Sequence, residues 1–159
     1  MKSINIRLSN VNVRLQNFSL SHIESQAISL RQEIFEKIIK EIFASIERQA
    51  VSNARCKCGK ALVKNGKVSR TIQTVGGKVT YLRVRMICKS CKRSYFPLDD
   101  VIGLASGIKH SIHATEALLD LATELPYEKT SRYQGKLAHI KTSPQTILDM
   151  ARMEGQRLS

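Results

Sequence analysis

The sequence predicts an α+β protein with a long N-terminal helix, a β-hairpin fastened by four cysteines, and a C-terminal three-helix unit of the helix-turn-helix kind. Apolar residues recur every three or four positions between residues 20 and 50, which is the period of an amphipathic helix. Apolar and polar residues alternate between residues 78 and 88, which is the period of a strand. After Ser111 the helical period returns. The predicted parts are an N-terminal arm and helix (1–54), a ribbon (55–98), a linker (99–110) and a helical domain (111–159).

The N-terminal part combines an ambiguous arm with a long helix. Residues 1–18 alternate loosely, which fits a short strand, a strand pair or an arm that orders against a partner. Ser19 or Ser21 can cap a helix that continues to about Ala50. A helix of about 30 residues is ~45 Å long, more than a small ribbon can cover. Self-association as a dimer through residues 20–50 is therefore a hypothesis.

The four cysteines of the chain lie in two close pairs: C-x-C-G at Cys56 and Cys58, and C-x2-C at Cys88 and Cys91. Two such pairs joined by a hairpin follow the plan of a zinc ribbon, in which four thiolates hold a structural Zn²⁺. The first pair is one residue shorter than the common spacing. Gly59 suits a turn there, because glycine tolerates positive φ.

Other roles for the cysteines stay open, namely buried apolar residues, two disulfides or redox-active thiols. Disulfides need an oxidising compartment, and we find no secretory signal in the N-terminal sequence. His110 and His113 form an H-x2-H pair that is an alternative to one cysteine pair, although histidines at a polar helix start are usually solvated. Four thiolates fill the zinc shell, so we expect a structural ion with no open catalytic position.

The formal charge of +13 lies almost entirely on the ribbon. Residues 55–98 hold twelve Lys or Arg and no acidic residue, whereas the segments before and after carry net charges of +2 and −1. Such a concentration of one sign favours a polyanionic partner, and double-stranded DNA is the leading candidate. An anionic membrane is less suited, since no basic amphipathic helix or apolar run of ~20 residues is present. We expect a soluble, cytoplasmic protein with no membrane partner.

The hairpin carries the predicted DNA contacts. We expect strand at residues 61–63 and 68–75, a turn at Gly76 and Gly77, and a return strand at 78–88. On the return strand, Leu82, Val84 and Met86 are predicted to pack, while arginines line the other face and touch successive phosphates. A solvated strand face is the alternative. The predicted phosphate contacts are Arg70, Lys78, Arg83, Arg85, Lys89, Lys92 and Arg93.

The C-terminal part predicts three short helices. Ser111 caps the first, Pro126 opens the second, and Ser143 with Pro144 gives the third a strong start. In a helix-turn-helix the last helix enters the major groove, although any small three-helix unit gives this pattern. The predicted base-reading residues are Gln145, Thr146 and Arg152. The side chains predicted to point inward include Ile112, Leu118, Thr130, Tyr133, Leu137 and Ile147.

The segments RTIQTVGGKVTYLRVRMICKSCKRSYFPLDDVIGL and ATELPYEKTSRYQGKLAHIKTSPQTILDMARMEG resemble the N-terminal half of bacterial transposases of the Kra-type and related Lre-type insertion sequences. The likeness runs from about Arg55 to Gly155. It departs in the short first cysteine pair and in Tyr95-Phe96, where a double Phe is usual. The resemblance implies a DNA-binding, zinc-containing front portion without the catalytic domain, whose acidic triad holds two metal ions.

This resemblance implies that the chain alone is not an enzyme. The chain ends where the catalytic domain would begin, and a separately encoded catalytic subunit is a possible partner. Asp99, Asp100, Asp120 and Asp149 are expected in capping or surface positions. Two alternatives remain: a stand-alone zinc-ribbon and helix-turn-helix transcriptional regulator or antitoxin, and an interaction module that binds protein or RNA.

Overall fold

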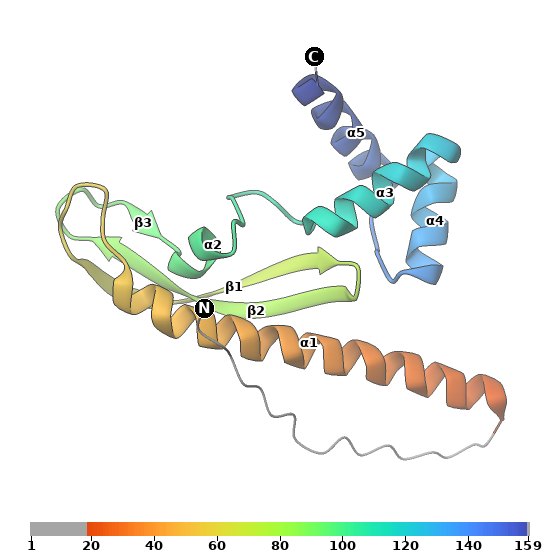
Figure 1. Ribbon diagram of the computed structural model, residues 1–159, viewed down its shortest axis with the longest axis horizontal. Coiled ribbons are helices and arrows are strands. Elements are labelled where there is room, and N and C mark those ends of the chain that lie inside the picture. Colours follow the sequence, from red (N-terminus) through yellow and green to blue (C-terminus); the bar gives the residue numbers. More distant parts are fainter. Residues whose placement is uncertain (1–18, 159) are drawn as a thin grey trace. The chain divides into compact units, whose positions relative to one another are not determined.

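The computed structural model describes residues 19–158 and confirms the mixed α+β class (Figure 1). The predicted arm at residues 1–18 lies outside the described residues. No described helix combines the length and apolar character needed to cross a bilayer. In chain order the elements are α1 (Leu20–Asn53), β1 (Leu62–Thr74), β2 (Gly77–Cys88), β3 (Ser94–Tyr95), α2 (Pro97–Val101), α3 (Ile112–Glu124), α4 (Tyr127–Leu137) and α5 (Pro144–Leu158).

The chain divides into two compact units, and the division cuts across the hairpin. The first unit takes the chain up to Arg70 together with Tyr81–Ser106, and the second takes Thr71–Thr80 together with the chain from Gly107 onward. The borders predicted at residues 54, 98 and 110 therefore do not coincide with those of the units. The turn end of the hairpin belongs with the C-terminal helices, which sequence period alone does not reveal.

α1 begins at the predicted cap and extends slightly further than expected. Ser19 is the N-cap, but its side chain does not cap; its carbonyl accepts the N–H groups of His22 and Ile23, each at 3.0 Å. The helix ends at Asn53, and Ala50 is its buried residue. Much of the predicted apolar stripe is thus only partly covered by the chain itself.

The sheet has the order β1-β2-β3, with β2 and β3 antiparallel and Met86 opposite Tyr95. The hairpin turn lies at Val75 and Gly76, one residue before the predicted glycine pair. Gly77 instead opens β2 with φ of 112°. The Thr74 hydroxyl donates to the Gly77 carbonyl at 2.8 Å and accepts the Gly76 N–H at 3.2 Å, which fixes this register.

Part of the predicted linker is helical. Residues 99–101 belong to α2, which begins at Pro97. Proline is preorganised for a first helical turn, and the carboxylates of Asp99 and Asp100 suit the positive end of the helix dipole. Leu98 is 1% exposed, and α2 packs against α1 in the first unit. Residues after Val101 lead to α3 without a further helix or strand, apart from an isolated bridge between His110 and Gln73.

The second unit has its own core, formed by Ala114, Leu118, Ile140 and Ile147. The predicted caps are confirmed, because Ser111 Oγ accepts the Ala114 N–H and Ser143 Oγ accepts the Thr146 N–H, both at 3.2 Å.

Three predicted inward residues of this unit are wrong. Ile112, Tyr133 and Leu137 are 68%, 40% and 78% exposed. Polar side chains on α4 turn inward instead, since Gln134 Nε2 donates to the Ala117 carbonyl at 2.7 Å and the Ser131 hydroxyl donates to the Thr142 carbonyl. These bonds satisfy backbone groups that a buried apolar face would leave unpaired.

Candidate metal centre

The first cysteine pair sits in a tight turn between α1 and β1. The Cys56 carbonyl accepts the Gly59 N–H at 2.9 Å, and the Cys56 N–H donates to the Lys60 carbonyl at 3.2 Å. Gly59, directly after Cys58, has φ of 80°. Glycine adopts this left-handed conformation without the steric cost that a Cβ brings, so the predicted role of Gly59 is confirmed.

The second pair repeats this turn with one more residue. The Cys88 carbonyl accepts the Lys92 N–H at 2.9 Å, and the Cys88 N–H donates to the Arg93 carbonyl at 3.1 Å. Lys92, directly after Cys91, has φ of 58°. In both turns, therefore, the residue after the second cysteine is left-handed. The shorter C-x-C spacing preserves the plan of the C-x2-C turn.

The two turns bring all four sulfurs together, with every ligand atom within 4.8 Å of the others. Cys56 Sγ lies 3.2 Å from Cys58 Sγ and 3.4 Å from Cys91 Sγ, and Cys58 Sγ lies 3.5 Å from Cys88 Sγ. Four sulfurs that each lie ~2.3 Å from a tetrahedral ion are ~3.8 Å from one another. Small shifts of the four sulfurs would therefore make room for an ion. The cysteines are free thiols rather than disulfides. The cluster can hold a metal ion.

Backbone amides lower the pKa of two of these thiols. The Cys58 N–H lowers the pKa of the Cys56 thiol to about 6, helped by the Tyr95 hydroxyl 3.2 Å from Cys56 Sγ. The Cys91 N–H likewise lowers the pKa of Cys88. A lowered pKa makes the thiolate easier to form, and the thiolate is the form that binds metal.

Neighbouring sulfurs raise the pKa of the other two thiols. The Lys60 N–H lowers the pKa of Cys58, but hydrogen bonds with the Cys56 and Cys88 sulfurs outweigh it and raise that pKa to about 11. The Arg93 N–H acts in the same way on Cys91, whose pKa is nevertheless raised by the Cys56 sulfur. Four thiolates at this distance repel one another, and a shared divalent cation would offset that repulsion. The residues present therefore fit a metal ion.

Gly59→Ala tests the backbone of the first turn. A Cβ at Gly59 meets no heavy atom within 4 Å, so the substitution is opposed by φ alone. We expect a cost of about 1–2 kcal/mol, seen as metal affinity weakened roughly 5- to 30-fold in competition with a chelator. Gly135→Ala is the control, because Gly135 also has open space and lies inside α4 without a positive φ. Equal metal affinity in both variants would contradict the importance of the turn.

The two histidines do not join the cysteines. His110 Nε2 lies 2.8 Å from the Thr142 hydroxyl in the second unit. Burial lowers the pKa of His110, and the nearby Lys109 charge adds to this. His113 Nδ1 lies 3.1 Å from Glu116 Oε2. Among the residues that the structure describes, the four cysteines are the group placed to hold a metal ion.

Two of the predicted phosphate contacts lie in a buried ion cluster. The carboxylate of Asp99 pairs with both Arg70 and Arg83, and the three side chains are 8%, 9% and 14% exposed. Arg70 also donates to the carbonyls of Leu104 and Ala105, at 3.2 and 2.8 Å. Neither guanidinium is presented outward, so both leave the set of predicted DNA contacts. Asp99 was predicted in a capping or surface position; it lies in the first turn of α2 but is buried, so it is not a surface carboxylate.

The environment of Arg83 explains why its guanidinium is buried, although the strand pattern predicted that it would point outward. Its guanidinium carbon lies 3.8 Å from the centre of the Phe96 ring. Burial lowers the pKa of Arg83, and the Arg70 charge lowers it further. Leu82, predicted to pack, is 61% exposed instead. Asp99 and the aromatic ring together supply a counter-charge and a stacking surface for this buried side chain.

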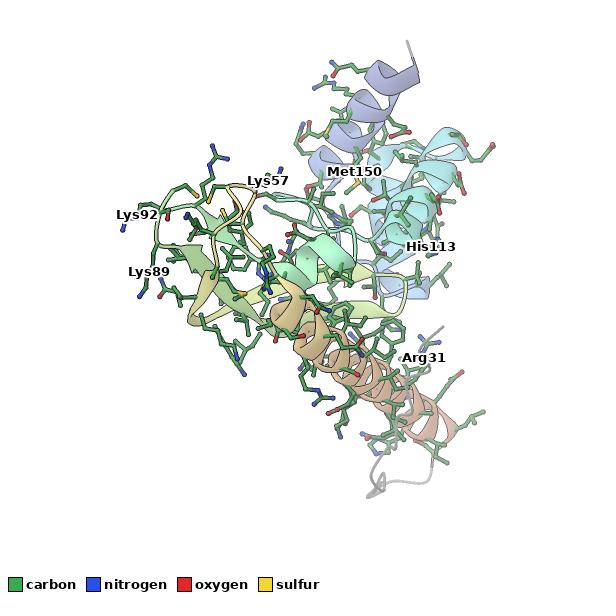
Figure 2. The ribbon with its side chains drawn as sticks, turned by 60° about the vertical axis from the view of Figure 1, so that its left-hand side comes forward. Arg31, Lys57, Lys89, Lys92, His113 and Met150 are labelled. Carbon is green, nitrogen blue, oxygen red and sulfur yellow. The ribbon has the colours of Figure 1, made fainter. Side chains whose placement is uncertain are left out.

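The remaining predicted cations differ in exposure and in place. Arg85 is half-buried and donates to the Ser94 hydroxyl at 3.2 and 3.0 Å. Lys78 is exposed in the second unit. Lysines around the cysteine turns extend outward, as Figure 2 shows for Lys57, Lys89 and Lys92. The "turn cations" are the exposed basic residues of the two cysteine turns: Lys57, Lys60, Lys89, Lys92 and Arg93.

The predicted base-reading residues all lie on α5. Gln145 is exposed, and its side-chain amide donates to Asp149 at 2.9 Å. Thr146 is half-buried, and its hydroxyl lies 2.8 Å from Ser143 Oγ within the helix cap. Arg152 is exposed. Gln145 and Arg152 are thus accessible, whereas Thr146 serves the start of the helix.

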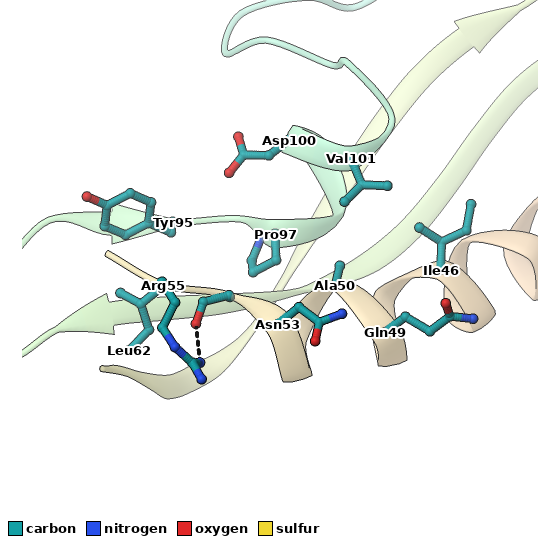
Figure 3. A pocket seen from close by; sticks show the side chains of 11 residues that line it. Ile46, Gln49, Ala50, Asn53, Arg55, Leu62, Tyr95, Pro97, Asp100 and Val101 are labelled. Carbon is teal, nitrogen blue, oxygen red and sulfur yellow. Dashed lines mark hydrogen bonds between the residues drawn. The ribbon is translucent and has the colours of Figure 1, made fainter. Parts of the chain in front are cut away.

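A cavity of about 540 Å³ lies within the first unit, where the end of α1 meets the ribbon and α2 (Figure 3). Apolar side chains form much of its wall, with Asp100 and Arg55 among its polar residues. The Arg55 guanidinium donates to the Ala54 carbonyl at 3.0 Å. Sequence period did not predict this cavity, because its wall comes from segments distant in the chain.

These features define a protein with a ribbon-type cluster of four cysteines that can hold a metal ion, set at a β-hairpin, and with a separate helical core. A model of the Uncharacterised protein family (UPF0236) matches residues 14–159, so the chain belongs to that family. It is 26% identical over 132 residues to a Streptococcus gallolyticus protein described as "UPF0236 protein in vanSb 3'region". The match covers 80% of this chain and spans 28% of the length of that relative.

Proposed function

We propose that this chain is the DNA-binding, zinc-containing N-terminal portion of a transposase. The observation that carries the proposal is the concentration of the turn cations around the metal centre, in a segment (55–98) without any acidic residue. A surface of one sign, rigidly held, favours the phosphate backbone of double-stranded DNA. The likeness to Kra-type and Lre-type transposases supports the choice of a transposase over other DNA-binding proteins.

Zinc is the ion that we assign to the centre. Four cysteine ligands suit zinc in a structural site, and bound zinc would fix the two turns relative to each other. The residues that hold it are Cys56, Cys58, Cys88 and Cys91. The turn cations then contact phosphates without reading sequence, while Gln145 and Arg152 on α5 contact base edges.

Catalysis is proposed to lie outside residues 1–159. Strand transfer by such transposases needs an acidic triad that holds two metal ions. In the described residues, Asp99 is occupied by two arginines, and Asp149 pairs with Gln145. A further segment or a separately encoded subunit would supply the triad. The chain itself would deliver that catalytic part to DNA, and its cytoplasmic location stays a prediction.

Neutralising two turn cations tests the DNA contact. The double substitution Lys89→Gln, Lys92→Asn removes two charges, and asparagine tolerates the positive φ at position 92. If each lysine neutralises one phosphate, the slope of log Kobs against log salt should fall in magnitude by about 1.8 on duplexes of any sequence. Fluorescence anisotropy across a salt series measures it.

The matched control neutralises two exposed lysines of α4, Lys129→Gln and Lys136→Gln, with the same change in total charge. We expect a much smaller change in slope there. Equal slopes for the two double variants would mean that net charge, and not the metal-centre turns, governs DNA binding. Retained binding to RNA or protein with no affinity for duplex DNA would favour an interaction module instead.

A further inference from the structure

α1 carries an apolar stripe that faces away from the contacts it makes with the other elements described for its unit. The contacts of α1 with the rest of its unit lie along its C-terminal half and include those of Phe43, Glu47 and Ala50. The Phe43 ring packs edge-on against Tyr81 with 4.8 Å between centroids, and Ala50 is buried. The Glu47 carboxylate accepts the Val84 N–H at 2.6 Å. These three residues define one face at the C-terminal half of the helix.

A second face begins at the other end of the helix. This "seam" consists of Leu20, Ile23, Ala27, Leu30 and Ile34. Its residues are spaced in alternating steps of three and four, which is the repeat of a coiled coil. At 100° per residue, the seam is centred roughly 170° around the helix from the face that contacts the first unit. Leu20 and Ile23 are 78% and 38% exposed, and the others are partly or largely exposed.

We propose that this seam pairs with the seam of a second copy of the chain, with the two helices antiparallel. In that arrangement Ile23 faces Ile34 of the second copy, and the small Ala27 faces the large Leu30. Alternation of small and large side chains across the pair fills the interface evenly. The seam is therefore complementary to itself, as a two-fold symmetric contact requires.

Charges beside the seam favour an antiparallel arrangement of the two helices. Glu24 and Arg31 are exposed at equivalent positions of successive heptads (Figure 2 labels Arg31). In an antiparallel pair such positions lie next to each other, so each Glu24 meets Arg31 of the second copy, and two-fold symmetry makes this contact twice. In a parallel pair Arg31 would instead meet Gln26, and the complementarity is lost. This proposal is independent of DNA binding.

Sedimentation of the metal-loaded full chain without DNA tests the pairing. We expect a monomer–dimer equilibrium whose dimer fraction grows with concentration. Leu30→Glu, in the middle of the seam, should leave only monomer. Ser25→Glu introduces the same charge at an exposed position off the seam and should still dimerise. A wild-type chain that stays monomeric, or a Leu30→Glu variant that dimerises like wild type, would overturn the proposal.

A charge exchange tests the direction. Glu24→Arg alone and Arg31→Glu alone each place like charges together in the antiparallel pair, so each should raise the dimer dissociation constant several-fold. The double variant restores opposite charges and should recover wild-type association. Single variants that associate like wild type, or a double variant as weak as the singles, would overturn the antiparallel arrangement.

Discussion

Replacing Cys88 with serine is expected to abolish metal binding and to unfold the ribbon around it. Cys88 is fully buried, and its backbone also makes both hydrogen bonds of the second turn. Structural zinc sites contribute about 10–16 kcal/mol of apparent binding free energy in small metal-dependent folds. The loss of one of four thiolates removes much of this stabilisation, so the ribbon should lose more stability than after any change outside the four cysteines. Native mass spectrometry would report the bound metal.

Ser90→Ala is the control for Cys88→Ser, since Ser90 lies within the same turn, is exposed and is not one of the four clustered residues. It should keep one zinc per chain and near-normal stability. We also expect chelation of the wild-type protein to reproduce the Cys88→Ser phenotype. If Cys88→Ser bound zinc as tightly as Ser90→Ala, the four-thiolate centre would be incorrect.

Asp99→Asn should give the second large effect. The substitution keeps the shape of the side chain but leaves Arg70 and Arg83 buried without their shared counter-charge. Removing one partner of a buried ion pair typically costs about 3–5 kcal/mol, because the remaining charge cannot be rehydrated. The Tyr81 hydroxyl, 3.4 Å from Asp99 Oδ1, offers little replacement, since it is neutral. Urea-induced unfolding of the metal-loaded protein measures the loss.

The neighbouring substitution Asp100→Asn provides a matched control. Asp100 occupies the same first turn of α2 but is exposed, so its loss should cost under about 1 kcal/mol, mostly from the helix dipole. Similar unfolding free energies for the two variants would show that the ion cluster does not stabilise the first unit.

The cysteine cluster was predictable because its signals are local. Each cysteine pair is fixed by a turn of a few residues, and Gly59 indicates the left-handed conformation in the first turn. The hairpin between the pairs then brings the turns together. The helix caps at Ser111 and Ser143 were predictable for the same reason, since each requires only its own next three residues.

The ion cluster was not predictable because its parts are distant in the chain. Arg70 and Asp99 are separated by 29 positions, and nothing near either residue indicates the pairing. Strand alternation assigned Arg83 to the outside and Leu82 to the inside, whereas the structure reverses them. Long-range counter-charges such as Asp99 override local pattern, as tertiary context often does. The net charge therefore predicted the sign of the surface more reliably than the identity of its exposed residues.

The proposed dependence of DNA binding on the zinc ribbon can be tested by binding of the metal-loaded chain to mixed-sequence duplex DNA across a salt series, repeated after chelation and after zinc is restored. We expect strong binding at low salt that falls steeply as salt rises, disappears on chelation and returns with zinc. A folded, zinc-loaded protein that does not bind duplex DNA even at low salt would contradict it.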